Sequence, residues 1–270
     1  MRPEEQLLRD GYPAYTTTVG WLGYSDQVVK DNCRRALLDG YTRFKAKVGS
    51  ESISRDRERL RLIRDQVGES AVLAVDANQK WEVEEAIAWM KQLRDFNLLW
   101  IEEPTAPDDV LGHLRISQAL APHGIGVATG EQAHNRILFK QLLQSGAMQF
   151  CQVDATRLAG LNEVLAVLLM AAKFKVPVCP HAGGIGLCNY VQHIAAIDFI
   201  AVSGSLKERM TEFCDHLHEH FSDPPVMRNG AYVLPRYHAY LGSMKADSMS
   251  EYEFPDGGYW RSRAAAAKQK

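Results

Sequence analysis

The stretch from Phe44 to Asp154 decides how this chain folds, because its short apolar runs end in charged residues. The runs read Phe44-Lys45-Ala46-Lys47-Val48, Val75-Asp76-Ala77-Asn78, Trp100-Ile101-Glu102-Glu103-Pro104, Thr129-Gly130-Glu131 and Gln152-Val153-Asp154, and a sixth, Val176-Pro177-Val178-Cys179-Pro180-His181, follows. Buried strands are apolar runs, and they rarely end in carboxylates or ammonium groups unless those ends face a site. We therefore interpret these runs as buried strands whose ends carry functional groups.

The charged ends recur at a regular interval of 23 to 29 residues along the chain. One strand, one turn, one helix and one return turn need about that many residues, so the interval predicts repeated βα units and a parallel sheet. In a parallel barrel the C-terminal ends of all strands meet at one mouth. We therefore expect an α/β barrel with one cluster of functional groups, formed by Lys45, Lys47, Asp76, Glu102, Glu131, Asp154 and His181.

Length and composition are those of a soluble globular protein. The chain has 270 residues, of which 46% are hydrophobic and 24% are charged, enough for one barrel. A net charge of −2 gives no reason to expect nucleic acid or an anionic membrane as a partner. No apolar run approaches the roughly 20 residues of a membrane span, and the N-terminus is not a secretory signal. The five cysteines form no Cys-x-x-Cys pair, which favours reduced thiols in an intracellular compartment.

Eight strands are expected, at residues 12–18, 42–48, 71–75, 98–101, 127–129, 149–153, 176–179 and 209–213. Helices are expected between them at 27–38, 54–67, 82–95, 108–121, 135–145 and 161–173, whereas 187–196 and 199–203 fit neither pattern clearly. Residues 223–270 contain several prolines, a glycine pair and no βα period. We expect residues 1–222 to form the barrel, and 223–270 to form a tail that packs on another part of the protein.

Asp76, Glu102 and Glu131 are carboxylates at three successive strand ends. Hard divalent cations such as Mg²⁺ prefer oxygen ligands, and three converging carboxylates without a cation would raise one another's pKa. Each could instead cap a helix or pair with Lys or Arg, but three at matched spacing would need three separate explanations. Because residues alternate along a strand, only one of Glu102 and Glu103 can point inward.

Lys45 and Lys47 are two residues apart on an expected strand, so their side chains point the same way. Two neighbouring ammonium groups lower each other's pKa, which makes one of them a usable base. The alternative is a solvated, lysine-rich edge strand. Asp154 and His181 end adjacent strands, where a carboxylate can fix the imidazole tautomer and raise its basicity. The alternative is a histidine bonded only to backbone.

Two further motifs carry less weight. His216, His218 and His220 would share one face of a strand and could then hold a metal, but the pattern fits a helix equally well, and in a helix they diverge. The glycines at 183, 184 and 186 lack the Gly-x-Gly-x-x-Gly spacing of a dinucleotide site. We therefore predict neither a histidine metal site nor a dinucleotide cofactor.

In this order, the Lys-x-Lys, Asp-x-Asn, Glu-Glu-Pro, Gly-Glu, Asp and His motifs resemble the mandelate racemase subgroup of the enolase superfamily. The longer strings look like L-fuconate dehydratases and their mitochondrial vertebrate relatives: Tyr-Pro-Ala-Tyr-Thr-Thr at 12–17, Trp-Leu-Gly-Tyr-Ser-Asp at 21–26, Asp-Ala-Asn-Gln-Lys-Trp at 76–81, Trp-Ile-Glu-Glu-Pro-Thr-Ala-Pro-Asp-Asp at 100–109 and Pro-His-Ala-Gly-Gly at 180–184. The resemblance extends to about Trp260.

The resemblance implies a TIM-type (β/α)₇β barrel with an irregular C-terminal tail, and Mg²⁺ held by Asp76, Glu102 and Glu131. It implies that Lys47, tuned by Lys45, removes the proton beside the substrate carboxylate, as Lys or His bases do in this superfamily. His181, held by Asp154, would act on the opposite face and expel the 3-hydroxyl. Further substrate contacts are expected from Glu212, Asn78, Trp21, His134 and Arg136.

The implied reaction is the dehydration of a sugar acid, L-fuconate, to 2-keto-3-deoxy-L-fuconate by a hydro-lyase. The expected location is mitochondrial or cytoplasmic, and a homo-oligomer is possible. Members of the superfamily begin with an α+β capping domain that this chain is expected to lack, which would expose the mouth to water. Two alternatives stay open: a non-catalytic truncated barrel that binds or regulates a partner, and a sugar-acid racemase or epimerase.

Overall fold

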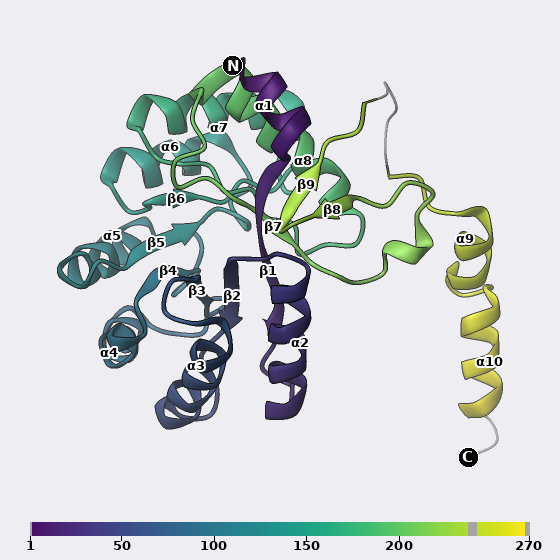
Figure 1. Ribbon diagram of the computed structural model, residues 1–270, viewed down its shortest axis with the longest axis horizontal. Coiled ribbons are helices and arrows are strands. Elements are labelled where there is room, and N and C mark those ends of the chain that lie inside the picture. Colours follow the sequence, from purple (N-terminus) through teal and green to yellow (C-terminus); the bar gives the residue numbers. More distant parts are fainter. Residues whose placement is uncertain (1, 237–241, 268–270) are drawn as a thin grey trace.

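The computed structural model describes residues 2–236 and 242–267, and its centre is a closed ring of parallel strands (Figure 1). The strands are β1 (Tyr12–Gly20), β2 (Arg43–Lys47), β3 (Val72–Asp76), β4 (Leu98–Glu102), β5 (Gly126–Thr129), β6 (Phe150–Cys151) and β7 (Thr211–Phe213). Neighbours from β1 to β6 pair in parallel, and β7 pairs with β1. The predicted α/β barrel is therefore confirmed.

The ring closes between β6 and β7 through a short extended segment. Val178 bridges to Cys151, and the amide of Glu212 donates to the carbonyl of Pro180 at 3.2 Å. The seventh strand, expected at 176–179, is reduced to this bridge. Pro177 and Pro180 have no backbone N–H and therefore cannot donate to a ladder.

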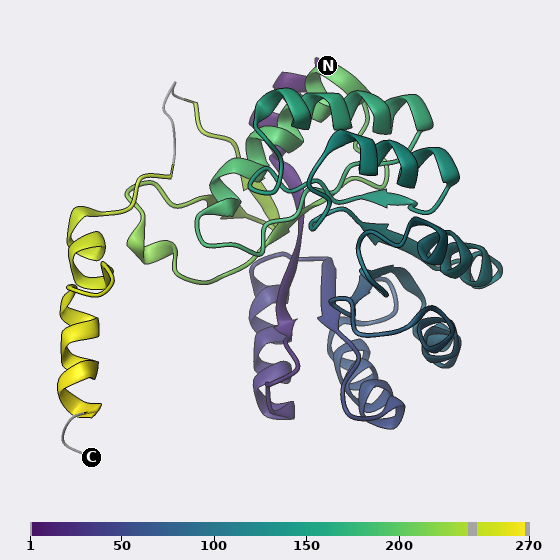
Figure 2. The same ribbon diagram turned by 180° about the vertical axis from the view of Figure 1, so that it is seen from behind.

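Helices surround the ring (Figures 1 and 2). They are α2 (Asp26–Leu38), α3 (Ile53–Val67), α4 (Val83–Leu93), α5 (Val110–Leu120), α6 (Arg136–Ser145), α7 (Leu161–Phe174) and α8 (Leu187–Ile197). Side chains of Ser25, Ser52 and Asn135 cap the N-termini of α2, α3 and α6. Additional elements are α1 (Pro3–Asp10), the 3₁₀ turns η1 (Arg94–Phe96), η2 (Ala121–His123) and η4 (His218–His220), and a π-helical turn η3 (Asp198–Ser203).

Two apolar layers hold the barrel together. The larger lies between the strands and the helices, and the smaller fills the inside of the ring below the mouth. In the inner layer the Trp100 ring lies 4.9 Å from the ring of Phe150 and 5.5 Å, edge-on, from that of Tyr15. This aromatic layer lies inside the ring, directly below the charged ends of the strands.

The chain after residue 222 divides into two parts. A hairpin of β8 (Val226–Arg228) and β9 (Ala231–Val233) joins the sheet antiparallel to β1, and it buries Tyr232 completely. α9 (Ala246–Tyr252) and α10 (Gly258–Ala267) form an arm that stands away from the barrel in both views (Figures 1 and 2). Within the segment expected to be a tail, the hairpin thus packs on the barrel itself.

None of the helices in the two described ranges is both long and apolar enough to cross a membrane.

Candidate active site

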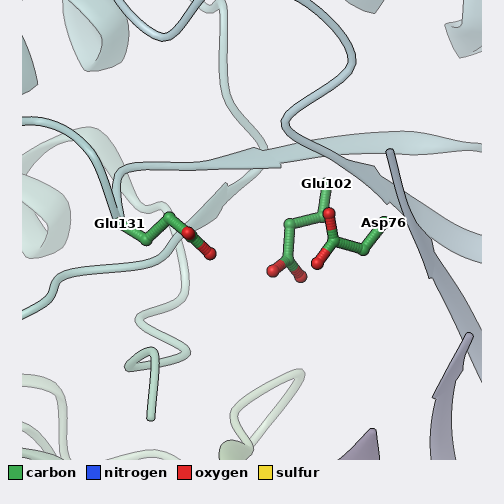
Figure 3. A group of neighbouring side chains, drawn as sticks. All are labelled: Asp76, Glu102 and Glu131. Atoms are coloured by element: carbon green, nitrogen blue, oxygen red, sulfur yellow. The ribbon is translucent and has the colours of Figure 1, made fainter. Parts of the chain in front are cut away.

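Three carboxylates converge at the mouth, as the spacing of the strands predicts. Asp76 ends β3, Glu102 ends β4 and Glu131 follows β5 by two residues, and one oxygen of each lies within 4.8 Å of the others (Figure 3). All three are buried. Burial and the nearby charge of Asp76 raise the pKa of Glu102 well above its usual value. Three crowded oxygen donors of this kind fit a hard divalent cation, which would relieve their repulsion.

Glu102 is held by donors that the motifs did not reveal. The side chain of Gln152 donates to Glu102 Oε2 at 2.6 Å, and the indole of Trp100 donates to the same oxygen at 3.2 Å. Glu103 points elsewhere and accepts from the amide of Gln79 at 2.6 Å. Burial, together with Glu131, raises the pKa of Glu103 to about 8. As alternation along the strand requires, only Glu102 takes part in the triad.

Lys45 and Lys47 lie on the same side of β2, and both reach the carboxylates. Lys45 Nζ is 2.5 Å from Glu102 Oε1 and 3.0 Å from Glu212 Oε1, whereas Lys47 Nζ is 2.5 Å from Asp76 Oδ2. Lys45 is fully buried, but Lys47 borders the cavity. The expectation that each lysine lowers the other's pKa is wrong for Lys45. Burial alone would lower its pKa, but the charges of Glu102 and Glu212 outweigh burial and raise it well above normal.

His181 lies between three carboxylates. Its Nδ1–H donates to Asp154 Oδ2 at 2.8 Å, and its Nε2 lies 3.2 Å from Glu131 Oε2. Burial would lower its pKa, but the bond to Asp154 and the charges of Glu212 and Glu131 raise it to about 9. Asp154 is itself fixed, because the backbone N–H and hydroxyl of Thr156 both donate to its other oxygen. Asp154 therefore fixes the orientation of the ring, and the surrounding carboxylates favour the protonated form of the imidazole.

Glu212, near the end of β7, completes the ring of charges. Its Oε1 accepts from the hydroxyl of Thr17 at 2.5 Å, and its Oε2 accepts from the amide of Ala182 at 3.0 Å. Burial would raise its pKa, but Lys45 and His181 outweigh burial and hold the pKa well below its usual range. Glu212 is thus an ionised group fixed by protein donors.

Five of these groups, Lys47, Glu131, Asp154, His181 and Glu212, line a cavity of about 310 Å³, whereas Asp76, Glu102 and Lys45 are buried and do not belong to its lining. Its lining consists of Trp21, Lys47, Asn78, Glu131, Asp154, Thr156, Arg157, His181, Gly183, Gly184, Leu187, Glu212 and Cys214. Trp21 and Asn78 thus lie where substrate contacts were expected. Thr156, Arg157, Leu187 and Cys214 belong to the lining without having been foreseen, because they lie on loops and a helix end that carry no motif.

Two expected substrate contacts lie outside this cavity. His134 and Arg136 are exposed, and neither belongs to the lining. The guanidinium and the backbone N–H of Arg136 both donate to the carboxylate of Glu163 on α7. Proximity to Glu131 in sequence does not bring them to the site, because the chain turns outward there into α6.

The histidines at 216–220 do not gather around one point. His218 stacks on Phe213 and bonds to the carbonyl of Cys214, whereas His220 bonds to the hydroxyl of Ser248. Within residues 2–236 and 242–267, the cluster with metal-ligating geometry is that of Asp76, Glu102 and Glu131. A second cavity, of about 420 Å³, lies outside the ring between α2 and β8 and contains none of the groups at the mouth.

Sequence comparison identifies the class of this fold and site. Residues 28–238 match the family described as "Enolase C-terminal domain-like", so the chain belongs to that family, within the mandelate racemase/enolase superfamily. It is 56% identical over 263 residues to "Mitochondrial enolase superfamily member 1" of Bos taurus, covering 97% of this chain and 59% of that protein. It is 52% identical over 256 residues to "L-galactonate dehydratase" of Hypocrea jecorina, covering 94% and 56%.

Solved structures agree with this assignment. The crystal structure of human mitochondrial enolase superfamily member 1 superimposes with a TM-score of 0.94 at 54% identity, covering 97% of this chain and 59% of that one. L-talarate/galactarate dehydratase from Salmonella typhimurium LT2, liganded with Mg and L-lyxarohydroxamate, gives 0.76 at 29% identity, covering 88% and 57%. The chain therefore spans about three fifths of the length of its relatives.

Proposed function

We propose that this chain is the barrel of a Mg²⁺-dependent sugar-acid dehydratase, a hydro-lyase, and that its substrate is L-fuconate. The observation that carries the proposal is a carboxylate triad that reaches the cavity through Glu131, together with a lysine bound to Asp76 and a carboxylate-bound histidine that both line the same cavity. Relatives named as dehydratases of L-galactonate and of L-talarate or galactarate support it, and one of these was crystallised with Mg.

Asp76, Glu102 and Glu131 would hold the metal. When bound, Mg²⁺ supplies Lewis-acid stabilisation of the negative charge that develops on a substrate carboxylate when the adjacent proton is lost. The protein's part is to hold the three ligands in place. Gln152 and Trp100 do so by binding one oxygen of Glu102, which fixes the orientation of that carboxylate.

Lys47 is the proposed base, and its Nζ would accept the proton from the carbon beside the substrate carboxylate. It borders the cavity, whereas Lys45 is fully buried and paired with three carboxylates. Lys45 therefore contributes a fixed positive charge. Glu212 would contact the substrate from the neighbouring strand end, and Asn78 and Trp21 would line the space around it.

His181 is the proposed acid, and its Nε2 would give a proton to the departing 3-hydroxyl. The neighbouring carboxylates raise its pKa, which favours the form that carries the proton, and Asp154 holds the ring. Loss of the proton beside the carboxylate and of hydroxide from the next carbon forms an enol. The enol then becomes the 2-keto-3-deoxy acid, so that one water leaves overall.

The stereochemistry and the deoxy end of L-fuconate favour it as the substrate. L-fuconate is 6-deoxy-L-galactonate, so it shares its stereocentres with the substrate in the name of the Hypocrea jecorina relative. The deoxy end is a methyl group, and Leu187 and Cys214 give the cavity an apolar side. As further parts of the proposal, the protein is mitochondrial, it assembles as a homo-oligomer, and the part of residues 223–270 that follows the β8–β9 hairpin packs against a capping domain.

The test is to incubate the 270-residue chain with Mg²⁺ and either L-fuconate, L-galactonate or galactarate, beside the bovine relative. Formation of 2-keto-3-deoxy acid, measured with semicarbazide, is expected and should be fastest with L-fuconate. Inversion beside the carboxylate without dehydration would favour a racemase or epimerase. Product from the relative alone would favour a non-catalytic barrel that binds a partner.

A further inference from the structure

We propose that Asp56 and Arg59, on the buried face of α3, are positioning residues that hold the loop bearing Trp21 and the loop that follows Lys47 at the mouth. The inference rests on the proposed function, because it concerns the placement of the proposed base. Neither residue touches the cavity, and both act through backbone groups. α3 is therefore part of the catalytic support as well as of the outer ring.

Arg59 fixes the loop after β1. It is 3% exposed, and its guanidinium donates to three successive carbonyls, at 2.9 Å, 3.1 Å and 3.2 Å, those of Gly20, Trp21 and Leu22. A guanidinium presents its donors as a rigid planar fork, so three bonds fix the loop in one orientation. Among the residues that the structure describes, Arg59 forms no ion pair with a carboxylate within 4.0 Å. Both of its Nη groups are therefore bonded to this loop, whereas its Nε is buried without a partner.

Gly20 makes this arrangement possible. A Cβ atom at Gly20 would lie 2.6 Å from Ala46 Cβ and 2.7 Å from Ala46 Cα, closer than side-chain contacts allow. The absence of a side chain lets the end of β1 pack against the middle of β2. The loop that starts at Gly20 thus begins directly beside the strand that carries Lys47, with α3 behind both.

Asp56 fixes the loop after β2. It is 1% exposed, and its Oδ2 accepts from the amide of Gly49 at 2.7 Å and from the indole of Trp89 at 2.9 Å. Its Oδ1 accepts from the amide of Ser50 at 3.3 Å. Gly49 has φ +84, in the left-handed region where glycine is favoured. The carboxylate thus holds the chain reversal that begins two residues after Lys47.

The two anchors work together. Asp56 and Arg59 are three residues apart on one face of α3, so a single helix holds both loops. The Trp21 ring lies 5.0 Å from Lys47 Nζ, and both side chains line the cavity. This cation–π contact depends on the relative placement of the two loops. Release of either anchor should let the ring and the ammonium group move apart.

Arg64 is a matched control on the same helix. It is 5% exposed and donates to four carbonyls, at 2.7 Å to 3.3 Å, those of Gly68, Ala71, Phe96 and Asn97. These carbonyls precede β3 and β4, at the end of the barrel opposite to the mouth. Arg59 and Arg64 therefore share burial, helix and bonding chemistry, and differ in the end of the barrel that they support.

The first experiment compares amide hydrogen exchange in the intact chain, Arg59→Met and Arg64→Met. Arg59→Met should speed exchange of amides 20–24 by about tenfold or more, whereas Arg64→Met should leave them unchanged and speed those at 68–71. This readout does not require activity, so it decides the inference even if the chain fails to dehydrate any sugar acid. Equal exchange of amides 20–24 in both variants would overturn it.

The second experiment uses kinetics and Mg²⁺ binding. Arg59→Met should lower kcat about tenfold or more, because a small misplacement of catalytic groups is costly, while calorimetric Mg²⁺ affinity stays within about twofold. Asp56→Asn keeps one acceptor oxygen and should retain more activity than Asp56→Ala. If Arg59→Met does not fold, Asp56→Asn and Arg59→Lys give the same comparison. Equal loss of Mg²⁺ affinity and of kcat would indicate general damage and refute the positioning role.

Discussion

Both ends of the barrel bury charged groups, but they satisfy them in opposite ways. At the base, Arg64 donates to four carbonyls, and Arg209 Nε pairs with Asp198 Oδ2 at 2.8 Å. At the mouth, five carboxylates face three cationic groups, namely Asp76, Glu102, Glu131, Asp154 and Glu212 against Lys45, Lys47 and His181. With every one of these groups ionised the mouth has an excess of two negative charges, which one divalent cation would neutralise, and the raised pKa of Glu102 reflects this crowding. At the base these charged groups bond to carbonyls or to an opposite charge, whereas the mouth gathers more carboxylates than cationic groups.

The largest expected effect is at the mouth. Lys47→Met should slow exchange of the proton beside the substrate carboxylate with solvent deuterium by about 10² to 10⁴, because it removes the proposed base. The exchange is followed by NMR of the sugar acid. Lys140→Met, on the exposed side of α6, is the matched control and should leave the rate unchanged. Undiminished exchange in Lys47→Met would remove the role given to this residue.

Substitutions at the base of the barrel should lower the stability of the protein. Arg209→Met leaves the buried carboxylate of Asp198 without its cation, which should lower the free energy of unfolding by about 3–5 kcal/mol. Urea denaturation measures the change. Asp198→Asn in the same chain removes the unpaired charge, so the double variant should recover part of the loss. A double variant no more stable than Arg209→Met would mean that the pair is not what this end of the barrel depends on.

The sequence predicted the mouth well, because strand spacing and charged strand ends report directly on a parallel barrel. Asp76, Glu102 and Glu131 lie where their intervals put them, and Lys47 and His181 follow from the same period. The short seventh strand was harder, since Pro177 and Pro180 limit its ladder.

Sequence reasoning missed residues whose role depends on tertiary contacts. A charged amphipathic pattern favours a solvated position for Asp56 and Arg59, yet both are buried by the loops that they hold. Thr156 and Arg157 lie on a loop without periodicity. The hairpin of β8 and β9 did carry a local signal, because Asn229-Gly230 both have positive φ, as hairpin turns of this type require. The Asn-Gly pair was not interpreted as a hairpin, because the prolines around it led us to expect an irregular tail.

Mg²⁺ should stabilise the protein through the mouth of the barrel, because the carboxylate triad lies there. At a Mg²⁺ concentration about 100 times the Kd, the free energy of unfolding should rise by about 2.7 kcal/mol, and EDTA should reverse the rise. Glu102→Gln should abolish it, because it replaces one carboxylate of the triad with a neutral amide. Thermal unfolding with and without Mg²⁺, at ionic strength matched with NaCl, measures this. An equal rise in Glu102→Gln would show that the cation binds elsewhere.

The smallest expected effect concerns the edge of the mouth. Arg136→Ala should leave kcat and KM within about twofold, because Arg136 is exposed, pairs with Glu163 and does not line the cavity. Arg157→Ala is the matched comparison, since Arg157 does line the cavity, and it should raise KM about fivefold through loss of a charged hydrogen-bond donor. Steady-state kinetics with the preferred sugar acid measure both. If Arg136→Ala raised KM as much as Arg157→Ala, the substrate would extend beyond the cavity toward α6, and Arg136 would be a substrate contact after all.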